Sequence, residues 1–162
     1  MDSDGYLSQL ADIFNGITVN TPSISAIIAI ALAGVLLLAS GFASASEIAF
    51  FSLTPSDRND IDEQNHPSDE KISALLGDSE RLLATILITN NFVNVTIIML
   101  CNFFFMNVFV FHSPLAEFLI LTVILTFLLL LFGEIMPKIY SAQKTLAFCR
   151  FSAPGIYFLE KV

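Results

Sequence analysis

Three long uncharged stretches dominate the hydropathy pattern of this 162-residue chain. The first covers residues 24–46, which is about the length that a helix needs to cross roughly 30 Å of hydrocarbon. The second covers residues 82–116 and is longer than one crossing requires, so we expect its outer end to continue as an exposed or interfacial aromatic segment. The third covers residues 118–132 and spans a bilayer only if residues 133–140 also lie at membrane depth. The pattern predicts an all-α integral membrane protein with spans at about 24–46, 82–108 and 118–137.

The polar segment between the first two spans, residues 54–80, carries helix signals of its own. Thr54 followed by Pro55 is typical of an N-cap and a first helical position. Residues 66–68, His-Pro-Ser, interrupt this helix, and Ser68 or the next residue can cap a second short helix that ends at Gly77. We therefore expect a helical hairpin that lies on one face of the membrane.

The segment after the third span, residues 141–162, mixes aromatic and aliphatic side chains with Arg150. Pro154 and Gly155 predict an interruption, because proline removes a helix hydrogen bond and glycine is a poor helix former. We expect a broken juxtamembrane helix at the interface.

Composition and charge exclude several classes of function. Apolar residues make up 55% of the chain and charged residues 14%, and the mean hydropathy is +0.75, far above that of an ordinary soluble domain. The net charge of -8 leaves no basic patch, which excludes nucleic acid as a partner. Cys101 and Cys149 lie far apart in apolar sequence, which predicts packing residues rather than a disulfide or a thiolate metal site. His66 and His112 stand alone, and without a nucleophile–base pair we do not expect an enzyme.

The basic residues are confined to two segments of the chain, and this sets the expected orientation. Three lie between the first and second spans and four follow the third span. By the positive-inside rule, residues 1–22 are extracytoplasmic, while the loop at 54–80 and the C-terminus are cytoplasmic. Residues 1–20 contain no Lys or Arg, unlike the start of a cleaved signal peptide, so we expect the N-terminal segment to be retained. The basic residues are Arg58, Lys71, Arg81, Lys138, Lys144, Arg150 and Lys161.

Polar side chains inside the first span are candidates for chemistry, because each is costly in lipid unless a partner or a function compensates. Ser40, Ser44 and Glu47 follow an i, i+4, i+7 spacing and therefore share one stripe of the helix. The serines alone also fit a packing face of small residues whose hydroxyls bond to their own helix. Glu47 is harder to explain in that way, although near the end of the span its carboxylate can reach water.

The second span holds Thr89, Asn90, Asn91 and Asn94 within six residues. Asn90 and Asn94 share a face at i, i+4, and Asn91 is rotated from Asn90 by about 100°. Asparagine amides can hydrogen-bond between helices, a purely structural role worth about 1 kcal/mol per bond. Amide oxygens are also ligands for hard cations, so an oxygen-lined cation site is the other interpretation.

A third polar group, Gly133, Glu134 and Pro137, follows the third apolar run. Pro137 has no N–H for the carbonyl four residues earlier, so we expect a kink that releases the Gly133 carbonyl oxygen beside the Glu134 carboxylate. A freed carbonyl at membrane depth must be buried in protein or face a watery cavity. The structural alternative is a proline that ends the span at the interface, with Glu134 among the lipid headgroups.

Three short motifs carry a resemblance to a known family. They are Phe42–Ala49 (FASASEIA), Thr85–Asn94 (TILITNNFVN) and Phe132–Lys138 (FGEIMPK). In content, order and spacing they resemble the signatures of the transmembrane domain of the CNNM/CorC family of magnesium transport proteins. The resemblance covers nearly the whole chain from about Ile24 onward, and the combination of Ser-x-x-Glu with Gly-Glu-Ile-x-Pro-Lys is specific.

The resemblance implies a three-span dimer whose inward-facing cavity binds Mg²⁺. On the matching positions of this sequence the ligands would be Ser44, Asn90, Asn94 and Glu134, with Gly133 supplying the backbone shape.

Further residues of the motifs are candidates for the surroundings of this site or for a coupling cation such as Na⁺. They are Glu47, Ser40, Asn91 and Thr89, and Pro137 is the expected helix kink. The family usually has glycine where this chain has Thr89, which puts a backbone contact at that position in doubt.

Two classes of function follow. In the first, the chain is the membrane domain of a CorC-like Mg²⁺ transporter or exporter in the bacterial inner membrane, with alternating access around the oxygen site. In the second, it is a membrane assembly or regulatory protein, of the type associated with gliding motility, that keeps the fold without transport. The oxygen set is intact apart from Thr89, which favours transport.

The resemblance also implies partners within one assembly. Family members carry cytoplasmic CBS domains, which often bind ATP, and a further C-terminal domain, so we expect this chain, which ends at Val162, to be a membrane-domain fragment. We expect a homodimer in the lipid bilayer. Gly34 and Gly41 lie seven residues apart on the first span and, with Ala45, predict a groove that a second helix can enter closely.

Overall fold

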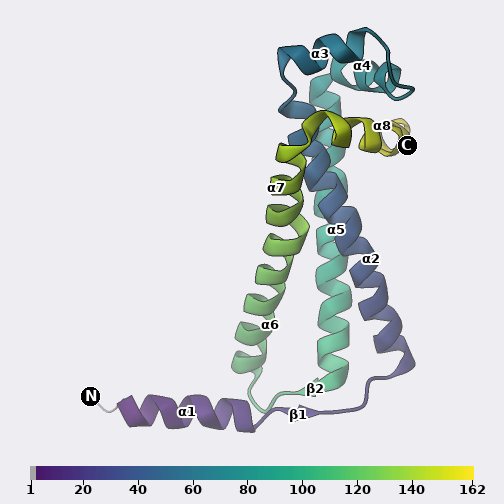
Figure 1. The fold of residues 1–162 in the computed structure, drawn as a ribbon. Helices are drawn as coiled ribbons and strands as arrows, with labels where there is room; N and C mark the ends of the chain where they lie inside the picture. The colour runs from purple at the N-terminus through teal and green to yellow at the C-terminus, as the bar shows by residue number, and fades with distance from the viewer. Residues whose placement is uncertain (1–2) are drawn as a thin grey trace.

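The computed structural model describes residues 3–162, so the first two residues of the expected extracytoplasmic segment lie outside the described part of the chain. Within these described residues, three helical stretches are long and apolar enough to cross a membrane, which confirms the three predicted spans. They are α2 (Ile24–Phe51), α5 (Ser79–Val108) and the stretch Pro114–Gln143. The third stretch consists of α6 (Pro114–Leu128), a π-helical segment η1 (Leu129–Ile135) and α7 (Met136–Gln143). The three spans lie close together at one end of the bundle and splay apart toward the other (Figure 1).

Each span begins at a polar cap that satisfies a free backbone N–H of its first turn. The Ser23 hydroxyl accepts a hydrogen bond from the Ala26 N–H at the start of α2. The Asp78 carboxylate accepts from the Arg81 N–H at the start of α5. Ser113 precedes Pro114, which occupies the first turn of α6, where a missing N–H costs nothing.

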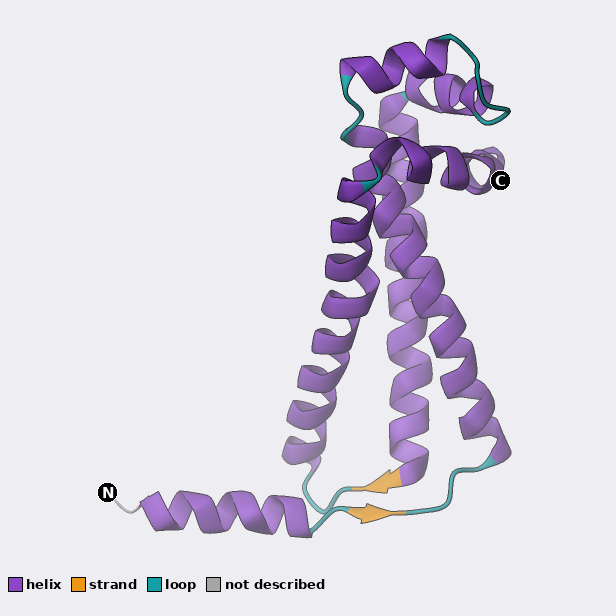
Figure 2. Cartoon of the chain, in the orientation of Figure 1, coloured by secondary structure: helices purple, strands orange, loops and turns teal. Residues whose placement is uncertain are grey.

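The splayed end of the bundle carries a short pairing that the all-α prediction did not include. Strand β1 (Thr18–Val19) pairs antiparallel with β2 (Phe109–Val110), between the chain before α2 and the chain after α5 (Figure 2). Of the aromatic residues expected to extend beyond the second span, Phe109 enters this pairing. Helix α1 (Ser3–Asn15) precedes β1 and contains no buried residue.

The opposite end is formed by α3 (Pro55–Asp62), α4 (Asp69–Gly77) and α8 (Thr145–Lys161) (Figure 1). Thr54 caps α3 as predicted, in a reciprocal capping box with Asp57. Hydrogen bonds from the Thr54 hydroxyl and backbone N–H lower the pKa of Asp57 from its ordinary value of 3.8. Ser68 makes no side-chain cap on α4.

The prediction of a break at Pro154 is wrong, because α8 runs unbroken from Thr145 to Lys161 with the proline inside it. Proline removes one hydrogen bond, but burial on both sides of it holds the helix in place. Ser152, Ala153 and Ile156 are buried, so the face of α8 around the proline is packed against the rest of the protein.

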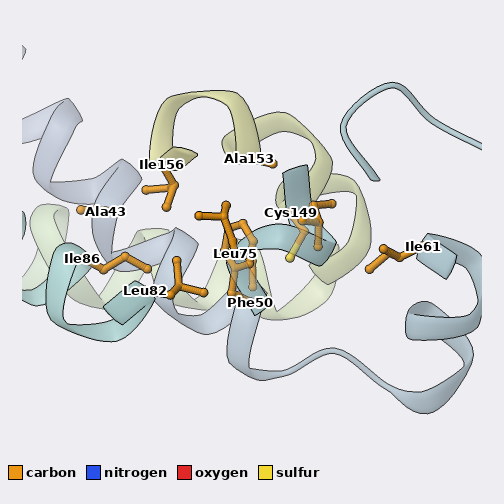
Figure 3. Close-up of a cluster of buried hydrophobic side chains, with 11 residues drawn as sticks. Ala43, Phe50, Ile61, Leu75, Leu82, Ile86, Cys149, Ala153 and Ile156 are labelled. Atoms are coloured by element: carbon orange, nitrogen blue, oxygen red, sulfur yellow. The ribbon is translucent and has the colours of Figure 1, made fainter. Parts of the chain in front are cut away.

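The main hydrophobic core lies at this end, where α8 and α4 cover the ends of α2 and α5 (Figure 3). Phe50, Ile72, Leu82 and Cys149 are fully buried in it. Burial raises the pKa of the Cys149 thiol to about 12, so this thiol stays protonated and acts as a small apolar side chain. Cys101 is also free and buried, in a smaller core between the spans, which agrees with the packing role predicted for both cysteines.

Candidate cation site

A group of polar side chains is buried between α2 and α5 inside the membrane-spanning part of the bundle. Ser40 is completely buried, Asn90 is 8% exposed and Asn94 is half-buried. The Ser40 Oγ lies 2.8 Å from the Asn90 Oδ1 and 2.6 Å from the Asn94 Oδ1. We call these three residues the Ser40 cluster.

The three side-chain oxygens of the Ser40 cluster share a single proton. A serine hydroxyl has one proton to donate, whereas an amide oxygen can only accept. With the amides oriented as in this structure, the Ser40 hydroxyl is the donor in both contacts and has one proton for two amide oxygens. This shortage of a proton is relieved when an amide turns its NH₂ group toward the serine, or when a cation lies among the oxygens.

The third span reaches this cluster at Gly133, which is buried. A Cβ atom on Gly133 would lie 3.2 Å from the Ser40 Oγ, closer than side chains normally pack. The absence of a side chain therefore allows the backbone of η1 to approach Ser40. In this way all three spans contribute to the surroundings of one serine hydroxyl.

Ser44 lies one helical turn beyond Ser40 and is also completely buried. Its Oγ has no hydrogen-bond partner among the residues that the structure describes. Leaving a buried polar group unpaired costs about 1–3 kcal/mol, so a ligand for this hydroxyl would be stabilising. Ser46, by contrast, donates to the Phe42 carbonyl of its own helix at 2.7 Å. The sequence allowed the same bond to the helix backbone for Ser40 and Ser44.

The third span widens into a π-helix just before Pro137. The Met136 N–H donates to the Leu131 carbonyl, five residues earlier. In that register the next donor would serve the Phe132 carbonyl, but residue 137 is a proline and has no N–H. In the π-helix, Pro137 therefore leaves the Phe132 carbonyl without a donor. The sequence, read as an α-helix, predicted that the Gly133 carbonyl would be released instead. The Phe132 carbonyl oxygen lies 3.4 Å from the position of a Cβ built on Gly41, so it points toward α2.

Glu134 lies in η1 directly after Gly133 and is half-buried. Within residues 3–162 its carboxylate forms no hydrogen bond and no ion pair. The other acidic residue of the motifs, Glu47, pairs with Lys138, with 3.4 Å between its Oε2 and the lysine Nζ. Lys138 lies one turn after Glu134 on the third span, but it pairs with Glu47 on α2. The Glu134 carboxylate therefore has no ion-pair partner among the described residues.

Two other candidates lie at the margin of the site. Thr89 is half-buried, and Asn91 is exposed on the outer surface of α5. Among the described residues, no cluster of three or more His, Cys, Asp and Glu side chains could hold a metal ion. A cation site here would therefore combine one carboxylate with neutral oxygens.

Contacts between α2 and α7 were not predicted from the sequence. The Ser141 Oγ donates to the Ala45 carbonyl at 2.6 Å, and a Cβ on Gly41 would lie only 3.0 Å from the Pro137 Cγ. Gly41 and Ala45 therefore contact α7 of the same chain, and both residues also line an apolar groove on this face, so the entry of a second copy there stays a prediction. Gly34 has open space around it.

The fold and these buried groups define a class: a three-span integral membrane protein with oxygen-bearing side chains gathered between its spans. The chain matches the family described as the Cyclin M transmembrane N-terminal domain (CNNM) over residues 30–162. It therefore belongs to the CNNM transmembrane domain family, as its three motifs predicted. A comparison with curated proteins found no match.

Proposed function

We propose that this chain is the membrane domain of a divalent-cation transporter and that the cation is Mg²⁺. The observation that carries the proposal is the Ser40 cluster, in which the Ser40 hydroxyl and the side-chain amides of Asn90 and Asn94 meet within 2.8 Å inside a membrane-spanning bundle. Membership in the CNNM family supports the same conclusion.

In this proposal the ion is bound by neutral oxygens and one carboxylate. Asn90 and Asn94 supply amide oxygens, and Glu134 supplies the negative charge. Ser44, whose buried hydroxyl has no partner among the described residues, is the serine that we assign as a ligand, while Ser40 positions the two amides. Mg²⁺ prefers six oxygens in near-octahedral geometry and gives up water reluctantly, so retained water molecules would complete its coordination.

The pair between Glu47 and Lys138 has a supporting role in this proposal. A lysine one turn after a glutamate on the same helix is well placed to pair with it. Glu47 instead engages Lys138 from α2, which keeps the lysine away from the Glu134 carboxylate. Glu134 then remains available to the cation, and a coupling ion such as Na⁺ would use the same polar stripe.

We further propose that the end of the bundle with α3, α4 and α8 is cytoplasmic, in a bacterial inner membrane. The basic residues lie on α3, α4, α7, α8, the first turns of α5 and the junction between α7 and α8, all at or leading to this end, which supports a cytoplasmic C-terminus under the positive-inside rule. A homodimer would form through the face of α2 that carries Gly41 and Ala45, where these two residues line an apolar groove of about 360 Å³ together with Leu38, Phe42 and Tyr140 among others. CBS domains would follow α8 in the whole protein.

The experiment that tests the ion site is the stabilisation of the purified chain by Mg²⁺. A ligand that binds only the folded state adds about 2.7 kcal/mol at a hundredfold excess over Kd. For a chain of this size each kcal/mol raises the melting temperature by about 2–4 °C, so we expect an upward shift of about 5–11 °C at saturating Mg²⁺. The melting temperature is measured by circular dichroism in detergent.

The variants Glu134→Gln and Asn94→Ala should remove this Mg²⁺-dependent shift, because each deletes a ligand. Asn91→Ala is the matched control: it makes the same change on the same helix, but on an exposed residue. It should keep the full shift. If Glu134→Gln keeps the whole shift, the carboxylate is not a ligand, and an assembly or regulatory role without transport becomes the better explanation.

A flux measurement separates binding from transport. The chain is reconstituted in liposomes that contain a Mg²⁺-sensitive dye, and Mg²⁺ is added outside. Dye response with the unaltered chain and with Asn91→Ala, but not with Asn94→Ala, is the result that transport requires. Binding without flux in all variants would favour the assembly role.

A further inference from the structure

Helix α1 presents an apolar stripe that no other part of the described chain covers. Its large apolar side chains are exposed by between 38% and 64%, and none of its residues is buried. The stripe consists of Tyr6, Leu7, Leu10, Ile13 and Phe14. We propose that α1 is an interfacial membrane helix, whose stripe is immersed in the headgroup layer of a bilayer with zwitterionic lipids.

The arrangement of side chains on α1 is amphipathic. At 3.6 residues per turn, the five apolar residues fall within an arc of roughly 120°. Asp4, Ser8 and Asp12 lie on the opposite side of the helix. A helix with one apolar face and one polar face, and with a length of a few turns, suits the plane of a membrane interface.

The position of α1 is fixed by contacts close to its C-terminal end. The chain after it is held by the β1–β2 pairing and by the hydrogen bond from the Asn20 N–H to the Val108 carbonyl at 2.7 Å. A ring nitrogen of His112 also hydrogen-bonds to the Gly16 carbonyl. These contacts attach α1 to the segment between α5 and α6, where two membrane spans end.

This attachment places α1 at the boundary of the membrane. Figure 1 shows α1 lying crosswise to the spans and extending away from them at the splayed end of the bundle. The apolar spans α2, α5 and α6 begin or end at the same end of the bundle as α1, so the bilayer that surrounds them reaches its headgroup layer near the level of α1. A helix held flat at that level can turn its exposed apolar stripe toward the lipid that surrounds the spans.

The charges of α1 select the kind of lipid surface. Within Ser3–Asn15 the ionisable side chains are Asp4, Tyr6 and Asp12, and no basic residue occurs. Attraction to anionic lipid needs Lys or Arg, so burial of the apolar stripe must provide the binding free energy here. Zwitterionic headgroups avoid repulsion with the two aspartates.

The family match begins at residue 30, so α1 lies outside the part of the chain that the CNNM domain accounts for. The inference needs only a membrane-embedded bundle and does not depend on cation transport. Its failure and the failure of the proposed function can therefore be told apart.

The absence of tryptophan from the whole chain allows a direct test. A single tryptophan is introduced by Leu10→Trp in the stripe or, as the matched control, by Ser8→Trp on the polar side. The full chain is reconstituted in phosphatidylcholine nanodiscs, and fluorescence is quenched either by aqueous iodide or by lipids with a quencher near the headgroup. Circular dichroism verifies that both variants keep their helices.

Immersion in lipid predicts that the Leu10→Trp emission is blue-shifted relative to Ser8→Trp, quenched by the lipid quencher and protected from iodide. Ser8→Trp should show the reverse. Equal quenching of both variants by iodide would overturn the proposal, since the stripe would then face water. Protection of Leu10→Trp from both quenchers would also overturn it, because a second copy of the chain or another protein surface would then cover the stripe.

Discussion

The pair between Asp69 and Arg150 provides the strongest test of how the end of the bundle is held together. The Arg150 Nε donates to the Asp69 Oδ1 at 2.9 Å, and the second Arg150 nitrogen, Nη2, donates to Oδ2 at 3.2 Å. The Asp69 side chain is completely buried and that of Arg150 is 23% exposed. The pair joins the start of α4 to the middle of α8, so we expect Arg150→Gln to weaken this whole end of the protein.

The magnitude follows from the burial of Asp69. At 2.9 Å and an effective dielectric constant of about 20, the attraction is about 6 kcal/mol before the cost of desolvation is subtracted. Removing one partner of a buried pair costs about 3–5 kcal/mol, because the remaining charge is left uncompensated. For a chain of this length, that loss lowers the melting temperature by about 6–20 °C.

The assay is thermal unfolding in detergent, followed by circular dichroism, with two comparisons. Arg81→Gln breaks the pair with Glu160, which is longer, at 3.5 Å, and in which the side chains are 60% and 15% exposed, so it should cost less than Arg150→Gln. The double variant Asp69→Asn/Arg150→Gln removes the buried charge, while the amide oxygen introduced at position 69 can still accept the hydrogen bond that the His66 N–H gives to Asp69. It should therefore be more stable than Arg150→Gln alone. Equal losses for Arg150→Gln and Arg81→Gln would refute the reasoning.

Two further changes test local packing and capping. Gly133→Ala should destabilise the chain by about 1–3 kcal/mol in thermal unfolding, because the added Cβ would lie 3.2 Å from the Ser40 Oγ. Gly34→Ala, in open space, should be neutral or stabilising by up to about 1 kcal/mol. A larger loss of stability for Gly34→Ala than for Gly133→Ala would contradict this packing. Thr54→Val should cost about 0.5–2 kcal/mol at neutral pH by removing the cap of α3, and should raise the pKa of Asp57 toward 3.8 in an NMR titration. Because the pKa of Asp57 is lowered in the folded state, its carboxylate stabilises the fold at pH values above 3.8, and this stabilisation is lost as the pH falls through the folded-state pKa. The cost of Thr54→Val should therefore shrink in acid. A cost that does not change with pH would argue against the hydrogen bond between Thr54 and Asp57.

Local features of the sequence determined where the helices lie. The uncharged stretch beginning at residue 24 is long enough to span a bilayer, and its burial in lipid does not depend on any partner in the chain. The cap at Thr54 was also predictable, because its hydrogen bonds involve residues only three positions apart. The candidate site could be located at the level of motifs for the same reason: Ser40, Asn90 and Asn94 were visible as polar residues in apolar helices.

Which of these residues meet was decided by the tertiary structure. Ser40 and Ser44 share one stripe, and only the axial position of α2 against α5 places Ser40, rather than Ser44, against Asn90 and Asn94. Sequence spacing describes one helix at a time and contains no information on how two helices are shifted along each other.

Because the sequence gives no direct information on how helices pack, it also left other contacts undecided or led to a wrong prediction. Gly41 predicts the close approach of another helix, and the structure places Pro137 of the same chain's third span against it. Pro154 predicts a helix break, but the buried residues beside it hold α8 continuous. Asp69 and Arg150 are 81 positions apart, and their pairing exists only because α4 and α8 pack together. Interactions between adjacent turns follow from the order of residues, whereas contacts between helices depend on packing that minimises the free energy of the whole chain.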